Sequence, residues 1–455
     1  MPDSAVTIVL AVAAAFTLLL LIPSLRQARA AGDLDISSAL TLGMAWLTSL
    51  PIALVAITGG LTRRPDAFGE LVPIFPSWYA NAVDFAVFFV AALAVIVAMR
   101  RLGAARIPVH AAGLLAILLW ALAHVSGLQD GRVPALRGSV LLVCLLAATV
   151  LPRGRGAPLG AGLFGVTLAA TSGFLAVFRG DAAFVVPCVN ACEGLGFTGV
   201  FPNPDLLGVT LAVSIPFAYI GFRTRARYWF VLYLAGMATA TGSRTAILVS
   251  LVSILVLLVV RPRVDTERTT AVRTAIAGLV LAGAVASSIY VVRHDWDPSA
   301  LTDRPALWNV ASEHVDESPW FGYGPQKWAS LFESGEIPRA AQRSTHNQWM
   351  DVLVAAGAVG ASVFAAMLAA MLWTAGRARA GVMVMLTTIT LIGTTEGTWS
   401  VGTLDFLSFS LVAAILTGEP EPEQRASPQR MTAPFAGAPR YPARANPVAE
   451  TTGSA

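Results

Sequence analysis

Runs of apolar residues of the kind that cross a lipid bilayer recur along most of this 455-residue chain. A bilayer core about 30 Å thick needs about 20 apolar residues in a helix. Only 13% of the residues are charged, about half the share in soluble proteins. We therefore predict an all-α, polytopic transmembrane helix bundle with about 12–13 spanning helices.

Thirteen runs are centred on residues 6–21, 39–57, 82–99, 109–125, 135–151, 159–178, 206–220, 228–240, 246–260, 272–291, 349–372, 382–392 and 404–416. Cleavage near Ala30 would leave twelve. The segment before Val6 lacks the positive charge of a secretory signal, however.

Basic residues gather in alternate loops between these runs, near residues 26–29, 100–106, 153–155, 223–227, 261–273 and 377–379. Cytoplasmic loops of membrane proteins carry an excess of Arg and Lys, so we predict that these loops face the cytoplasm. The loops 59–80, 126–134, 179–205, 241–244, 293–345 and 393–403 then lie outside. The Pro-rich tail is expected to be disordered and cytoplasmic.

This topology divides the chain into five parts. They are the N-terminal helices (1–178), helices with an outer Gly/Pro-rich loop (179–292), a long extracytoplasmic loop (293–345), the C-terminal helices (346–417) and the tail (418–455).

The longest polar interruption, residues 293–347, ends with the motif Ser-Thr-His-Asn. Thr345 followed by Gln348 is the pattern of a capping box, which predicts that His346 lies in the first turn of the next spanning helix. The positive end of the helix dipole disfavours an imidazolium there. A neutral imidazole can accept a proton at neutral pH, so His346 is a candidate general base. The alternative is an interfacial histidine bonded to a neighbouring loop.

A short amphipathic helix is predicted earlier in the same loop, from Arg304 to Ala311. Asp303 can cap it, and Pro305 is near its first position. Trp308 would lie on its apolar face and suits the membrane interface. Arg304 would then begin this helix.

A second arginine is predicted at a helix start within the membrane region. A continuous helix from Tyr228 to Val260 would be about 50 Å long, too long for the bilayer. The chain must therefore turn, and Gly242-Ser243 is the natural place. Ser243 can cap the next helix and leave Arg244 in its first turn. Helix N–H groups with an arginine form a site for an oxyanion or phosphate. The alternative is an arginine that extends to the membrane surface.

The outer loop 179–205 contains a Gly- and Pro-rich segment that predicts either a tight turn with a proline stop or a loop lining a cavity. It also contains Cys188 and Cys192. Outside the membrane is an oxidising location, so a disulfide between them is one hypothesis and two free thiols are the other. A metal site is disfavoured because no histidine accompanies the pair. Cys144 lies within an apolar run and is expected to pack there.

Four ionisable residues lie within or next to apolar runs: Asp84, His110, His124 and Glu396. Such residues are functional candidates by default. Glu396 is the strongest of them, because its segment would border the same outer cavity as His346. Packing is the alternative for each.

Three features in this order resemble the bacterial O-antigen ligase and O-antigen polymerase superfamily. They are a G-x-F-x-x-P-N-like loop before a helix, a later Ser-Arg turn, and a long outer loop with R-x-x-x-W, G-x-G and His-Asn. The resemblance covers residues 194–416. Members are polytopic glycosyltransferases that act on lipid-linked glycans outside the cytoplasmic membrane. The resemblance implies that Arg244 and Arg304 hold the pyrophosphate of a polyprenyl-diphosphate-linked glycan, and that His346 activates the acceptor hydroxyl.

The chain departs from this family in the first feature. Asp205 stands where members usually have Asn, and the arginine common shortly before the motif is missing. Arg179, at the start of the same loop, could fold back in its place. Further candidates for substrate contacts are Arg179, Asn203, Trp308, Asn347 and Glu396.

The leading hypothesis is a glycan ligase, which moves a saccharide from the lipid carrier to a hydroxyl of a glycan or lipid acceptor. Direct displacement predicts inversion at the anomeric carbon, with no metal or other cofactor. A polymerase that extends lipid-linked repeat units is the alternative within the superfamily. A small-solute transporter is the alternative of another class. The lack of a convincing internal repeat and the location of charge in loops disfavour it. No nucleic-acid partner is expected, because the net charge of +4 reflects topology.

Overall fold

The computed structural model describes residues 4–58, 62–65, 71–74, 76–102, 108–129, 131–132, 135–184, 195–262, 271–297, 300–337 and 344–419. Its elements are α1 (Ser4–Ala30), α2 (Ile36–Thr58), β1 (Thr62–Pro65), β2 (Leu71–Ile74), α3 (Ser77–Leu102), α4 (Ala111–Gln129), α5 (Leu136–Val150), α6 (Gly156–Arg179), η2 (Gly180–Ala183), α7 (Pro204–Gly221), α8 (Ala226–Ala240), α9 (Arg244–Val260), α10 (Ala271–Arg293), α11 (Ala300–Glu317), α12 (Lys327–Glu333), α13 (Gln348–Thr374), η4 (Gly376–Ala378), α14 (Arg379–Ile392) and α15 (Ser408–Leu416).

Every predicted apolar run coincides with a helix, which confirms the all-α prediction. Among the described residues, eight helices are long and apolar enough to cross a bilayer, so the chain is a multi-pass membrane protein. The other five runs form helices of 9 to 17 residues: α5, α8, α9, α14 and α15. The predicted outer loop 59–80 contains a short antiparallel hairpin, in which Thr62 of β1 lies opposite Ile74 of β2.

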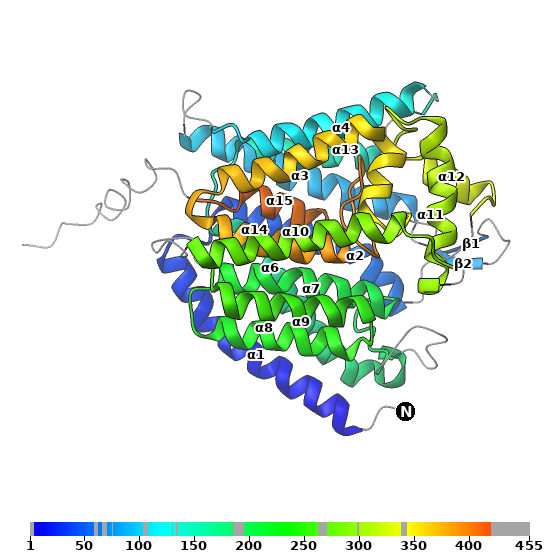
Figure 1. Cartoon of the computed structure of the whole chain (residues 1–455). Coiled ribbons are helices and arrows are strands. Elements are labelled where there is room, and N and C mark those ends of the chain that lie inside the picture. The colour runs from blue at the N-terminus through cyan, green and yellow to red at the C-terminus, as the bar shows by residue number, and fades with distance from the viewer. Residues whose placement is uncertain are drawn as a thin grey trace, which may run out of the picture. The chain divides into compact units, whose positions relative to one another are not determined.

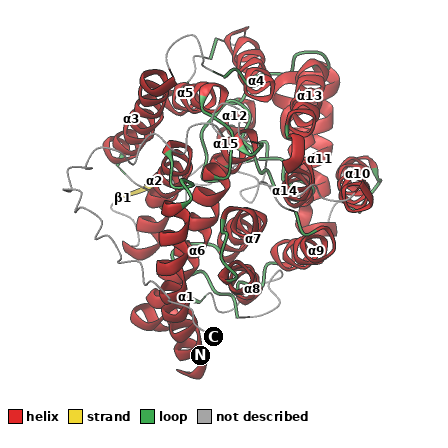
Figure 2. Ribbon diagram, turned by 90° about the vertical axis from the view of Figure 1, so that its left-hand side faces the viewer, coloured by secondary structure: helices red, strands yellow, loops and turns green. Residues whose placement is uncertain are grey.

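Helices α6 and α7 form the centre of the bundle, as the end-on view shows (Figure 2). The most apolar part of α7 is 89% buried and that of α6 is 67% buried, against 22% for α1 and α10. Small residues allow the close approach. A Cβ added at Gly162 would lie 2.6 Å from the Cα of Ala218, and one at Gly221 would lie 2.5 Å from the Cα of Leu159. Membrane helices pack through such small residues because lipid gives them no hydrophobic drive to associate.

The loops predicted to be cytoplasmic are connected to one another at one end of the bundle. Arg223 binds the carboxylate of Asp33 through two hydrogen bonds of 2.5 and 2.9 Å. Arg153 donates to the carbonyls of Ile415 and Thr374, each at 3.2 Å. These contacts connect the regions of the predicted loops near residues 26–29 and 223–227, and of those near 153–155 and 377–379. The grouping of the remaining loops with them stays a prediction. Which compartment they face stays a prediction.

The polar segment between α10 and α13 has an apolar cluster of its own, which includes Leu307, Trp308 and Ala311 of α11 and Trp328 of α12. These two helices lie beside the hairpin at one end of the bundle (Figure 1). The predicted apolar face of α11 is confirmed. Its predicted start is wrong, because the helix begins at Ala300, three residues before Asp303.

Helix α13 is broken at Gly357, which has a φ of 61° and a ψ of −163°. The segment after α11 fills the break. The N–H groups of Tyr323 and Gly324 donate to the carbonyls of Val354 and Ala355, both at 2.9 Å. On the other side of the break, backbone carbonyls of the same segment accept from the N–H groups of residues 358 and 359. Backbone groups freed inside a membrane helix must find such protein partners.

The last predicted span, residues 404–416, is helical only over the nine residues of α15. Nine residues of helix are about 14 Å long, less than half of the bilayer core. The irregular loop 393–407 therefore forms the rest of this predicted span and leads into α15. Leu404 N–H donates to the carbonyl of Arg137 at the start of α5. Irregular backbone at membrane depth is tolerated where it lines a cavity.

We predict that Gly357→Ala destabilises the protein by about 2–4 kcal/mol, because left-handed backbone and overpacking each cost about 1–3 kcal/mol. A Cβ there would lie 2.3 Å from the carbonyl carbon of Trp320. Thermal unfolding of purified protein in detergent measures the effect. Gly283→Ala in α10, where no heavy atom lies within 4 Å of the added Cβ, is the control and should change stability little. Equal unfolding temperatures for the two variants would contradict the prediction.

Candidate functional site

Helix α13 is capped by Asn347, not by Thr345 as predicted. The Asn347 side-chain oxygen accepts from the N–H groups of Trp349 and Met350 at 2.9 and 3.2 Å. Thr345 instead hydrogen-bonds to the backbone of Asn347. His346 therefore lies just before the helix, with a left-handed φ of 57°, and not in its first turn.

The Asn347 amide is fully engaged within the protein. Its nitrogen donates to the carbonyls of Thr394 and Ser288, at 3.1 and 3.3 Å. An amide has two acceptor and two donor positions, and all four are used. The predicted substrate contact of Asn347 is therefore replaced by a structural role, which joins the start of α13 to α10 and to the loop after α14.

Glu396 connects Arg304 and His346. One carboxylate oxygen accepts from the Arg304 guanidinium, and the other is 2.7 Å from Nδ1 of His346. A carboxylate next to Nδ1 holds the proton on that nitrogen, which leaves the lone pair of a neutral ring on Nε2. The structure thus unites three residues that the sequence nominated separately, and it gives His346 the tautomer of a general base.

The ionised form of Glu396 is favoured within this group. Burial raises the pKa of its carboxyl, but the hydrogen bond and charge of His346 and the charge of Arg304 outweigh that effect. The net pKa is below the ordinary value of 4.5. Arg304 is therefore paired with an ionised carboxylate. This pairing indicates that Arg304 positions Glu396.

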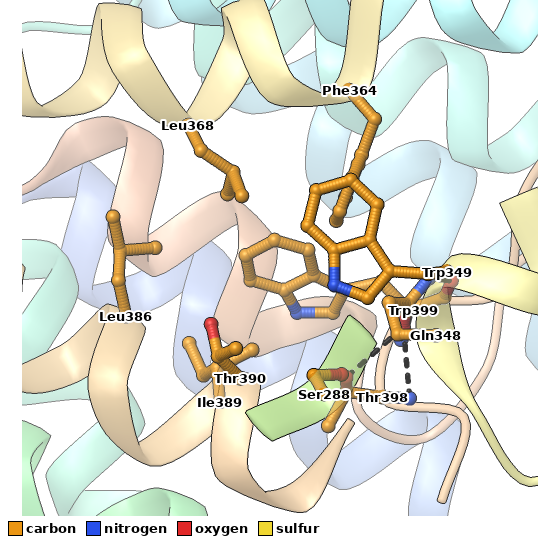
Figure 3. A pocket seen from close by; sticks show the side chains of 10 residues that line it. All are labelled: Ser288, Gln348, Trp349, Phe364, Leu368, Leu386, Ile389, Thr390, Thr398 and Trp399. Carbon is orange, nitrogen blue, oxygen red and sulfur yellow. Dashed lines mark hydrogen bonds between the residues drawn. The ribbon is translucent and has the colours of Figure 1, made fainter. Parts of the chain in front are cut away.

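Gln348, the first residue of α13, fastens the loop that carries Glu396 (Figure 3). Its side-chain oxygen accepts from the N–H and hydroxyl of Thr398, both at 3.0 Å, and from the N–H of Trp399 at 2.7 Å. Its backbone N–H donates to the Gly393 carbonyl at 2.8 Å. These bonds hold Glu396 in reach of His346, two residues before Gln348. The adjacent cavity has a volume of about 10 Å³, which is room for about one water molecule, so this region is packed structure.

Trp308 also positions the histidine. Its side chain is only 2% exposed, and its indole N–H donates to the Thr345 carbonyl at 3.0 Å. The half-buried Asp351 accepts from the Thr345 N–H at 2.8 Å. Trp308 is not among the residues that line the cavity described next, so the structure gives it a positioning role and not the substrate contact expected from the sequence.

A cavity of about 360 Å³ opens beside His346 and Glu396. Its walls come from α2, α3, α5, α7, the segment before α13 and the loop after α14. The lining residues are Thr48, Pro51, Ile52, Asp84, Arg137, Asp205, Leu206, Val209, Ser344, His346, Glu396, Gly397, Ser400, Thr403, Leu404, Asp405, Phe406 and Leu407. Parts of several loops predicted to lie outside thus meet at one end of the bundle. The volume is in the range of small-molecule sites.

Arg244 begins α9, and Ser243 caps that helix, as predicted. The Ser243 hydroxyl oxygen is 3.5 Å from the Ala246 nitrogen. Arg244 is exposed and does not line the cavity. The next residue, Thr245, hydrogen-bonds to Thr395 at 2.9 Å. Arg244 and Glu396 are therefore each one residue from a direct contact between α9 and the loop after α14.

The outer loop before α7 is held by Arg179 through contacts with backbone carbonyls. Its guanidinium donates to the carbonyls of Gly199 and Ala56, at 2.7 and 3.1 Å. Asn203 caps α7 by accepting from the Asp205 N–H at 2.7 Å. Neither Arg179 nor Asn203 lines the cavity, whereas Asp205 does.

The cysteine hypotheses have different outcomes. Cys188 and Cys192 lie outside the described residues, so their pairing stays a prediction. Cys144 is fully buried in α5, as expected. Within the described ranges, no three His, Cys, Asp or Glu side chains are grouped so that they could hold a metal ion.

Sequence reasoning did not identify Arg137, Gln348 or Asp351 as parts of this site. Arg137 begins an apolar helix far away in sequence, and only its place in the cavity reveals it. Asp84, its partner, carried a signal as an ionisable residue in an apolar run. Gln348 was noticed only as part of a capping box.

Comparison with known proteins gives one match. Residues 229–365 match a family model described as O-antigen ligase. This range contains Arg244, Arg304 and His346 and ends before Glu396. No curated protein and no solved structure matches the chain.

We predict that acid weakens the wild-type protein through Glu396. Because its pKa is lowered in the folded protein, its contribution to stability is full above pH 4.5 and is lost as pH falls through the folded pKa. Glu396→Gln should therefore show a smaller loss of unfolding temperature between pH 6 and about pH 3. Glu313→Gln, which changes an exposed carboxylate of α11, should follow the wild type. Parallel curves for wild type and Glu396→Gln would refute this role.

Proposed function

Since residues 229–365 match a family model described as O-antigen ligase, we propose that the protein transfers a saccharide from a polyprenyl-diphosphate carrier to an acceptor hydroxyl. The observation that supports this reaction most is the 2.7 Å contact between Glu396 and Nδ1 of His346 at the wall of the cavity. It gives the cavity a base with a defined proton position.

The chemistry requires a base for the incoming hydroxyl and positive charge for the leaving group. His346 Nε2 accepts the proton of the acceptor hydroxyl as its oxygen bonds to the anomeric carbon. The bond from that carbon to the diphosphate breaks, and the electron pair leaves with the diphosphate. Attack opposite the leaving group inverts the anomeric centre. Glu396 stabilises the imidazolium that forms, and Arg304 keeps Glu396 in place.

We further propose that this site faces outward from the cytoplasmic membrane of a bacterium. Its loops contain few of the arginines that gather in the alternate loops, and the positive-inside rule assigns the arginine-rich side to the cytoplasm. A donor whose lipid remains in the outer leaflet would then reach the cavity from the membrane, and the acceptor would reach it from outside.

We predict that His346→Ala lowers transfer by about 100- to 10,000-fold, the range for loss of a general base, while the protein still inserts and folds. The assay uses purified protein, a defined polyprenyl-diphosphate glycan and an acceptor. His294→Ala, which changes an exposed histidine near the end of α10, is the matched control. Full transfer by both His346→Ala and Arg304→Ala would show that the site is assigned wrongly.

Transfer by the wild-type protein is expected to persist in excess chelator, because the proposed displacement uses charge supplied by arginine. Loss of activity on chelation, restored by a divalent cation, would overturn the metal-independent mechanism.

In cells, a deletion of the gene that leaves intact lipid-linked polymer identifies a ligase. A deletion that loses long chains identifies a polymerase, the alternative within the family.

A further inference from the structure

Among the described residues that line the 360 Å³ cavity, Arg137 is the one arginine or lysine. We propose that Arg137 binds the diphosphate of the lipid-linked donor, in the role that the family resemblance implied for Arg244 and Arg304. This inference rests on the proposed transfer reaction and deepens it, because it identifies where the leaving group lies.

The pairing of Arg137 leaves most of its guanidinium available. Its Nε donates to Oδ2 of Asp84 at 3.2 Å. No described residue accepts a hydrogen bond from its two terminal nitrogens. The Asp84 side chain is only 5% exposed, whereas that of Arg137 is 45% exposed. The carboxylate is thus buried, and the arginine side chain is accessible from the cavity that it lines.

The pairing of Arg137 with Asp84 suits reversible binding of an anion in the cavity. The two terminal nitrogens of arginine bind phosphate oxygens in parallel. Asp84 holds the guanidinium through Nε and compensates its charge when the cavity is empty. An uncompensated arginine within the membrane region would be costly.

The backbone fixes Arg137 relative to the histidine. The Arg137 carbonyl accepts from the Leu404 N–H at 3.3 Å, and a Cβ added at Gly138 would lie 2.9 Å from the Gly402 carbonyl oxygen. The start of α5 is therefore packed against the loop 393–407. The same loop carries Glu396, so one short segment connects the proposed diphosphate site to His346.

Charge on the cavity wall points to the same residue. Four carboxylates line the cavity: Asp84, Asp205, Glu396 and Asp405. Arg304 is engaged by Glu396, and Arg244 lies outside the lining. A diphosphate in this cavity would be repelled by the acidic wall unless it lay at Arg137.

The test measures binding of polyprenyl diphosphate, the leaving group without sugar, to purified full-length protein in lipid nanodiscs. Arg137→Gln should weaken binding about 10- to 100-fold, the effect of losing charge-assisted hydrogen bonds, and Arg137→Lys should weaken it less. Arg293→Gln, which changes an exposed arginine at the end of α10, is the control and should bind like the wild type. In transfer assays, Arg137→Gln should raise the KM for the donor, whereas Arg304→Gln should mainly lower kcat.

Asp84→Asn separates binding from a structural role. It removes a competing carboxylate but keeps the arginine, so binding should tighten. If Asp84→Asn weakens binding as much as Arg137→Gln, the pair is structural and the inference is wrong. The inference is also wrong if Arg137→Gln affects only the glycan-bearing donor and not polyprenyl diphosphate, since the arginine then binds an anionic sugar. Failure of the wild type to transfer from any polyprenyl-diphosphate glycan would instead overturn the proposed function.

Discussion

The Glu396 carboxylate is the interaction on which the site depends. It joins Arg304 of α11, His346 before α13 and the loop after α14. These segments belong to three separate parts of the chain. The two oxygens of one side chain connect the arginine to the imidazole. A carboxylate that is hydrogen-bonded to the imidazole and lies next to the guanidinium has a lowered pKa and remains ionised. In the proposed reaction, Glu396 therefore both positions His346 and stabilises the charge that the imidazole acquires.

Irregular backbone is the second constraint. A membrane bundle tolerates it only where protein or a cavity satisfies the exposed N–H and carbonyl groups. This chain meets that condition twice, at the break in α13 around Gly357 and in the loop that leads to α15. Both places border the polar segment or the cavity. The break attaches the segment after α11 to α13, and the loop carries Glu396 toward His346.

The surroundings of the arginines in the structure differ from those that the sequence predicted. Sequence position alone made Arg304 and Arg244 equivalent, as cations at helix starts. The structure distinguishes them, because Arg304 is engaged by a carboxylate and Arg244 is exposed beside the site. Arg137, in the half of the chain without recognisable motifs, is the arginine whose guanidinium faces the cavity. Motifs indicated His346 as the candidate base, but they did not indicate every cation around it.

The sequence by itself determined the class of fold and the positions of the helices. It also predicted the grouping of loops on two sides and a role for His346. Each of these depends on local composition or on charge counted along the chain, which apolar periodicity and the arginine pattern record directly. It misplaced the caps of α11 and α13, because several polar residues in a row can each serve as a cap and packing selects one. Only the tertiary structure decided that Glu396 connects Arg304 with His346 and that Asp84 holds Arg137 at the cavity. Those pairs join residues 50 to 92 positions apart, and a contact across that distance depends on how the helices pack, which no local pattern records.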